Sequence, residues 1–328
     1  MKNFKFLASS IMISSVLAFT AACGNSDDAN TNSSNSGQQS SSESGSSEQK
    51  LEGEIAIDGS STVGPIMEAV SEEFSAEHPD VKAPIGISGT GGGFEKFTAG
   101  ETDISNASRP IKDEEKKVAE ENGIEYTEFK IAFDGLSVVV NKENDWVDKL
   151  TIEDLAKIWK GEPKKWSDIN PEWPDEQIKY FSPGTDSGTY DYFDEVVLGG
   201  EPIVKDATLS EDDNVLVKGV ANDKNAIGYF GYAYYLENKD QLKVVPIVNS
   251  KGEAVEPTNE TIEKGTYEPL SRPLFIYVNN KSLKEKPQVY EYVKYALENA
   301  GELSEEVGYV KLPKEQYDEQ LKTLEGLK

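Results

Sequence analysis

The chain has 328 residues, with 60 Asp+Glu against 33 Lys+Arg, a formal net charge of −27 and a single cysteine. Nucleic-acid-binding proteins present basic surfaces, so this charge balance argues against nucleic acid as a partner. A small anionic ligand is still compatible with it, because surface charges are screened beyond roughly 8 Å at physiological salt and a site can be built from local dipoles.

The first 22 residues are predicted to be a signal peptide. Lys2 and Lys5 precede the apolar stretch Phe6–Phe19, which is too short for a membrane span. The segment ends in small residues before Cys23 and resembles a bacterial lipobox, although lipoboxes prefer leucine where Thr20 stands. The alternative is an ordinary signal peptide with an incidental cysteine. We expect Cys23 to be lipidated, since a secreted chain with one cysteine cannot form an internal disulfide.

Residues 23–50 are predicted to form the lipidated cysteine and a disordered tether. The segment consists largely of Ser, Asn, Gly, Gln and Glu, with almost nothing apolar. It cannot bury enough surface to offset its ordering entropy. Two acyl chains of the palmitate class would supply stable anchoring. The sequence therefore predicts a lipoprotein on the extracellular side of a bacterial cell membrane.

From residue 51 onward, short apolar runs alternate with helical stretches, which is the pattern of an α/β fold. A strand over residues 54–57 leads into a loop and a helix, and a strand over residues 81–87 leads into a glycine-rich loop and a short helix over residues 94–99. Further helices are predicted at residues 66–77, 113–122, 146–159 (capped by Thr151), 210–220 (capped by Ser210, with Val215, Leu216 and Val220 inward), 287–299 and 314–327. Further strands are predicted at residues 129–141, 178–181, 226–230, 242–248 and 275–278.

The order of these elements predicts two lobes with a hinge. Residues 51–135 form the first part of lobe 1, residues 136–270 form lobe 2, and residues 271–328 return to lobe 1. The chain would cross between the lobes at residues 133–137 and again near Arg272. A ligand contacted by both lobes would lie in the cleft between them.

Four loops rich in hydroxyls or glycine lie at predicted strand-to-helix junctions, where α/β sheets collect ligands. Free backbone N–H groups at a helix start, together with hydroxyl donors, can hold an oxyanion, and Arg109 adds a guanidinium that can fork onto one. Taken singly, each loop is more often only a helix cap. The loops are Ser60–Thr62, Ser88–Gly93, Ser108–Arg109 and Thr185–Thr189. Three fall in lobe 1 and one in lobe 2.

Five stretches in this order resemble the phosphate-specific substrate-binding proteins of bacterial ABC transporters, and the similarity covers about residues 51–328. The stretches are Asp58–Pro65, Ser88–Phe94, Asp103–Pro110, Gly184–Thr189 and Ser271–Phe275. The resemblance implies a periplasmic-binding-protein-like fold whose two α/β lobes close around dehydrated inorganic phosphate. It also implies that the protein delivers phosphate to ABC permease subunits, which work with a cytoplasmic ATPase. The resemblance further implies that the protein is a monomer without a cofactor or metal.

The resemblance assigns ligand contacts residue by residue. The positions that match phosphate-contacting loops of the family are Ser61 and Thr62, Ser88 or Thr90, and the lobe 2 run Ser187, Gly188 and Thr189.

Two departures from the family pattern bear on sulfate rejection. Ser108 stands where the best-known members have an aspartate that accepts a proton from phosphate, and Ser182–Gly184 lacks their arginine. Arg109 is a candidate to replace that arginine from the other lobe. Asp186 is a candidate proton acceptor and equally a candidate helix cap. A carboxylate acceptor rejects sulfate because fully deprotonated sulfate leaves it unpaired.

Three other functions are weighed against phosphate binding. The loops alone are compatible with another oxyanion, such as sulfate or molybdate, but the order of motifs favours phosphate. A secreted serine hydrolase or phosphatase would need a histidine, and the only one, His78, is predicted to cap a helix end. The sequence has neither a G-x-S-x-G elbow nor a histidine-rich metal set. If the protein were an adhesin, the presence of four oxyanion-type loops would have to be a coincidence. We therefore predict a binding protein that is not an enzyme.

Overall fold

The computed structural model describes residues 50–185 and 187–328. The predicted signal peptide, the predicted lipidation site Cys23, almost all of the predicted tether, and Asp186 lie outside the described residues.

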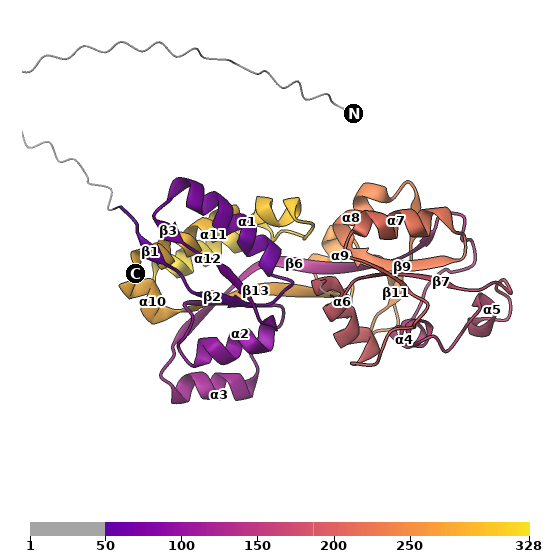
Figure 1. Cartoon of the computed structure of the whole chain (residues 1–328), viewed down its shortest axis with the longest axis horizontal. Helices are drawn as coiled ribbons and strands as arrows, with labels where there is room; N and C mark the ends of the chain where they lie inside the picture. The colour runs from indigo at the N-terminus through magenta and orange to yellow at the C-terminus, as the bar shows by residue number, and fades with distance from the viewer. Residues whose placement is uncertain (1–49, 186) are drawn as a thin grey trace, which may run out of the picture. The chain divides into compact units, whose positions relative to one another are not determined.

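A nine-stranded sheet forms the centre of the fold (Figure 1). Its strand order is β4 (Ile85–Ile87), β2 (Ile57–Gly59), β5 (Ile104–Ala107), β13 (Ser271–Asn279), β6 (Tyr126–Asn141), β9 (Ala226–Gly231), β7 (Lys179–Pro183) and β8 (Thr208–Ser210), with β10 (Leu242–Val244) also paired to β6. Short strands β1 (Gly53–Glu54) and β3 (Val81–Lys82) form one small sheet, and β11 (Ile247–Val248) and β12 (Ala254–Val255) form another.

Strands β6 and β13 join two parallel halves of this sheet. β6 pairs antiparallel with β13 over Tyr126–Gly135 and then with β9 over Leu136–Val140. On one side, β4, β2 and β5 run parallel, and on the other β8, β7 and β9 do. We refer to these halves as lobe 1 and lobe 2. The two-lobed α/β fold is thus confirmed, while the lobe boundaries at residues 135 and 271 stay a prediction.

The helices pack on both faces of each half. Those of lobe 1 are α1 (Gly64–Glu77), α2 (Gly89–Thr98), α3 (Asp113–Glu121), α10 (Asn280–Glu285), α11 (Pro287–Glu306) and α12 (Lys314–Glu325). Those of lobe 2 are α4 (Ile152–Lys160), α5 (Trp166–Ile169), α6 (Gly188–Phe193), the π-helical turn η1 (Asp194–Leu198), α7 (Asp213–Asn222), α8 (Tyr232–Asn238) and α9 (Asn259–Glu263). Figure 1 shows α2 and α3 on the opposite side of β2 and β13 from α1, α11 and α12.

The predicted helix of residues 66–77 is present as α1. Its apolar residues Ile66, Met67, Val70 and Phe74 are all buried, because they recur at helical spacing and face one side. Phe74 meets Tyr292 of α11 edge-on, with ring centroids 5.2 Å apart. This packing fixes the direction of α1, and with it the position of the loop that precedes the helix.

In helix α4 the predicted cap is present, but the helix starts at a different residue from the one predicted. Thr151 accepts a hydrogen bond from the backbone of Asp154 at 3.0 Å, and the Asp154 carboxylate accepts one from the Thr151 backbone at 3.1 Å. This capping box begins the helix at Ile152. The prediction that the helix starts at Trp146 was therefore wrong, because the Thr151 cap makes it start later.

The glycine-rich run after β4 is helical, and its prediction as a loop was wrong. Helix α2 starts at Gly89, so the run forms its first turn. A Cβ atom on Gly93 would lie 2.6 Å from the Gly59 Cα and 2.9 Å from the Ser105 Oγ. Glycine at this position lets α2 lie directly against β2 and β5.

Helix α7 also differs from its prediction. It begins at Asp213 with Asp212 as the capping residue, instead of Ser210. Leu216, Val217 and Val220 are buried, whereas Val215 is 44% exposed. The prediction that Val215 faces inward was wrong, because helical spacing places Leu216, Val217 and Val220 on one face and Val215 outside it.

Candidate functional site

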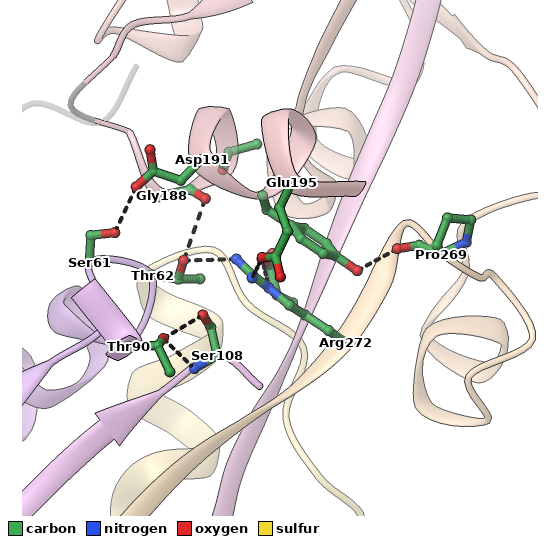
Figure 2. Close-up of polar contacts among 12 residues, drawn as sticks. Ser61, Thr62, Thr90, Ser108, Gly188, Asp191, Glu195, Pro269 and Arg272 are labelled. Carbon is green, nitrogen blue, oxygen red and sulfur yellow. Dashed lines mark hydrogen bonds and ion pairs between the residues drawn. The ribbon is translucent and has the colours of Figure 1, made fainter. Parts of the chain in front are cut away.

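Two of the predicted loops meet where lobe 1 faces lobe 2 (Figure 2). The Ser61 hydroxyl donates to the Asp191 carboxylate at 3.2 Å, and the Thr62 hydroxyl donates to the Gly188 carbonyl at 3.4 Å. A Cβ atom on Gly188 would lie 2.7 Å from the Thr62 Oγ1 and 2.8 Å from the Thr62 Cα. The start of α1 and the start of α6 therefore approach each other more closely than any side chain at position 188 would allow.

Contacts within lobe 2 position α6. Ser187 caps the helix, and its hydroxyl accepts from the Thr189 backbone N–H at 3.2 Å. At the other end, Phe193 stacks on Tyr229 with ring centroids 3.9 Å apart. The cap of α6 is thus Ser187, and the predicted contact of this serine with a ligand stays a prediction.

A cavity of about 450 Å³ lies beside these contacts. The oxyanion-type residues on its wall are Ser61, Ser187, Gly188 and Thr189, and the acidic residues are Asp134, Glu211 and Asp213. Burial, reinforced by the neighbouring Asp212 carboxylate, raises the pKa of Asp213 to about 6. At neutral pH the cavity therefore combines hydrogen-bond donors with carboxylates that repel an anion, so ligand binding depends on well-placed donors.

The other two predicted loops of lobe 1 also meet. The hydroxyls of Thr90 and Ser108 are hydrogen-bonded at 3.0 Å, and the Ser108 backbone donates to the Thr90 hydroxyl at 3.2 Å. Ser88 instead donates to the Asp58 carboxylate, which also pairs with Lys96 at 2.5 Å. The Ser88 hydroxyl is thus bonded to a charged acceptor and the Thr90 hydroxyl to Ser108, and which of the two contacts a ligand stays a prediction.

Arg109 is directed at its own lobe. Its guanidinium forms a bidentate pair with the Glu115 carboxylate at 2.8 and 2.9 Å and lies 5.4 Å from the Phe94 ring centroid. A further hydrogen bond goes to the Pro110 carbonyl at 3.1 Å. These three bonds use three of the five N–H donors of the guanidinium, so the pair with Glu115 still leaves donors for a ligand, and the predicted contact between Arg109 and a ligand stays a prediction.

A second guanidinium, which the sequence reasoning placed only at the hinge, lies in the site. Arg272 donates to the Thr62 Oγ1 at 2.9 Å and pairs with Asp134 at 3.4 Å and Glu195 at 3.7 Å. The guanidinium also lies 3.6 Å from the Tyr192 ring centroid (Figure 2). A signal was available, because Arg109 and Arg272 are the only arginines in the chain and each stands within Ser-Arg-Pro.

Two α/β lobes joined by two strands, with a hydroxyl-lined cavity where the lobes meet, define a solute-binding protein. A family model described as "PBP superfamily domain" matches residues 35–300. The chain is 50% identical to the phosphate-binding protein PstS of Staphylococcus saprophyticus over 278 residues, which is 85% of this chain and 86% of that protein. It therefore belongs to the PBP superfamily and, within it, to the family of phosphate-binding proteins PstS.

Solved structures agree with this family. A possible phosphate binding protein from Planctomyces limnophilus superposes with a TM-score of 0.81 at 47% identity, covering 84% of this chain and 99% of that one. An ABC-type phosphate transport receptor from Vibrio cholerae superposes with a TM-score of 0.61 at 26% identity. The match covers 79% of this chain and 100% of that chain. Within the described residues, no helix has the length and apolar character needed to cross a membrane.

Proposed function

We propose that the protein is the extracellular phosphate-binding component of an ABC importer. It captures inorganic phosphate by hinge closure and delivers it to the permease without catalysing a reaction. The observation that carries the proposal is the meeting of Thr62 at the start of α1 with Gly188 at the start of α6. Relatives named as phosphate-binding proteins support the choice of ligand.

The proposed ligand contacts are hydroxyl, backbone and side-chain donors of both lobes, four of which (Ser61, Ser187, Gly188 and Thr189) line the cavity. They are Ser61, Thr62, Thr90 (or Ser88) and Ser108 from lobe 1, and Ser187, Gly188 and Thr189 from lobe 2, with Arg109 and Asp186 as further candidates. Hydrogen bonds to a charged group contribute roughly 1.5–3 kcal/mol each, whereas micromolar affinity needs only about 8 kcal/mol. This set of donors can therefore bind phosphate tightly and still offset the ordering cost of closure.

Titration calorimetry of the purified protein with phosphate, sulfate and molybdate tests the proposal. We expect phosphate to bind, sulfate and molybdate to bind far more weakly, and Ser187→Ala to weaken phosphate binding by roughly tenfold through the loss of one charge-assisted hydrogen bond. Thr323→Ala, which changes an exposed hydroxyl of α12, serves as the control.

Equal affinity for sulfate would contradict the choice of phosphate, and parent-like binding by Ser187→Ala would place the site elsewhere. The same titration of Arg109→Ala decides between a ligand contact and the Glu115 pair as the main role of that guanidinium.

We propose that Cys23 carries a diacyl anchor that holds the protein on the extracellular face of the membrane. Its position after an apolar segment, as the only cysteine of the chain, supports this role. Labelling of growing cells with a fatty acid should mark the protein, and the label should disappear in Cys23→Ser. Label retained by that variant would show that the anchor is elsewhere.

A further inference from the structure

We propose that Arg272 is a positioning residue that orients the Thr62 hydroxyl as a donor toward Gly188 on the wall of the ligand cavity and couples this orientation to lobe 2 through Glu195. The inference rests on the proposed function, because it concerns how the same site holds phosphate. It goes beyond the ligand contacts that the resemblance assigned, because Arg272 is not among them.

Arg272 lies at the junction of the two lobes. In the antiparallel ladder of β13 and β6 it stands directly opposite Asp134, so the two side chains share one face of the sheet. The Arg272 side chain is 10% exposed and that of Asp134 is 4% exposed. Because a buried charge without a partner is costly, Asp134 holds the guanidinium at the hinge.

The contact with Thr62 fixes the direction of a hydroxyl. A threonine hydroxyl has one hydrogen to donate. Since Arg272 donates to the Thr62 Oγ1 at 2.9 Å, that oxygen acts as an acceptor on the hinge side. Its own hydrogen then points toward lobe 2, where the Gly188 carbonyl accepts it at 3.4 Å. The bond is long, so a phosphate oxygen beside Gly188 could take the same hydrogen at little cost.

The contacts with lobe 2 come from α6 and the turn that follows it. The guanidinium lies over the Tyr192 ring at 3.6 Å and is 3.7 Å from the Glu195 carboxylate. The Tyr192 hydroxyl donates to the Pro269 carbonyl and so holds the ring in place. Rotation of α6 away from Thr62 would therefore also disturb the surroundings of Arg272.

The charge of Arg272 also bears on a departure seen in the sequence. The chain has no arginine before its Ser187-Gly188-Thr189 run, and its other arginine is held by Glu115. Arg272 donates to the Thr62 hydroxyl, which donates to Gly188 on the cavity wall. The charged residues of that wall are all carboxylates. It thus supplies positive charge near the oxyanion donors without contacting the ligand.

Three variants test the inference by phosphate titration. Glu195 is 60% exposed, so Glu195→Gln should fold normally and weaken phosphate binding about threefold, as expected for an exposed ion pair. Glu201→Gln, at an exposed position after η1, is the matched control and should bind as the parent does. Arg272→Lys keeps the charge but loses the planar fork, and should weaken binding about tenfold.

A double-variant cycle separates orientation of Thr62 from a general structural effect. If Arg272 acts through the Thr62 hydroxyl, then adding Arg272→Lys to Thr62→Val should weaken binding by less than about twofold further, because coupled residues are not additive. Small-angle scattering with and without phosphate should show a smaller change in radius of gyration for Glu195→Gln than for Glu201→Gln.

Additive losses in the cycle, or a Glu195→Gln variant that matches Glu201→Gln in affinity and scattering, would overturn the inference while leaving phosphate binding by the parent intact. Absence of phosphate binding by the parent would instead refute the proposed function itself.

Discussion

Gly188→Ala is expected to weaken phosphate binding about 100-fold, since overpacking a close contact costs 1–3 kcal/mol and here opposes closure directly. The added Cβ would lie 2.7 Å from the Thr62 Oγ1, 2.8 Å from its Cα and 2.9 Å from its backbone nitrogen. Two of these three atoms are backbone, so no side-chain rotation relieves the collision. The lobes would have to stay further apart, and donors from one lobe would no longer reach a ligand held by the other.

The free energy of unfolding should change little in this variant, because alanine is a better helix former than glycine and the collision is relieved when the lobes separate. Urea unfolding and phosphate titration of the same preparation provide the two measurements. Gly326→Ala is the control, since a Cβ there would meet its nearest atoms at 3.4 and 3.6 Å. Parent-like phosphate affinity in Gly188→Ala would show that close approach of α6 to Thr62 is not needed for binding.

Asp134→Ala should lower the free energy of unfolding by about 3–5 kcal/mol, because it leaves a buried arginine without its partner. The carboxylate is 4% exposed, and its partner Arg272 is 10% exposed. Burial raises the pKa of Asp134, and the Arg272 guanidinium acts in the opposite direction. The charge pair is thus held against a desolvation cost, which is why loss of one member is worse than loss of both.

Urea unfolding at pH 7 measures this effect. The free energy of unfolding of Asp134→Ala is best compared with that of the double variant Asp134→Leu with Arg272→Met. Replacing both charges with apolar groups is often neutral, so the double variant should recover most of the lost stability. Asp148→Ala, at an exposed position of lobe 2, should stay within about 0.5 kcal/mol of the parent. A double variant no more stable than Asp134→Ala would mean that packing, instead of charge compensation, dominates at this position.

The sequence predicted the structure best where a local pattern of residues favours a single local structure. Thr151 was predicted to cap a helix, and the structure confirms this cap, with Asp154 completing the capping box. The apolar spacing of α1 predicted its buried face correctly. Alternating strands and helices, with a late return of the chain, predicted the two-lobed fold before any contact was known.

Tertiary contacts decided the points that local patterns did not. The glycines after β4 were predicted to form a loop. They lie in helix α2 instead, and Gly93 has to be a glycine because α2 packs directly against Gly59. Ser88 and Thr90 are equivalent hydroxyls in sequence, and only the position of Asp58, thirty residues earlier, distinguishes them. Arg272 looked like a hinge residue because its partners Thr62 and Glu195 lie far from it in sequence.

The bridge between the lobes has a mechanical consequence. β13 is hydrogen-bonded to β6 from Ser271 to Asn279, with one register shift between Leu274 and Phe275. A ribbon of this kind resists shear along its length and yields by twisting, most easily at an irregularity in the ladder. We therefore expect the lobe closure proposed above to twist this ribbon against its hydrogen-bonded backbone, and to need no unfolding of a connecting loop.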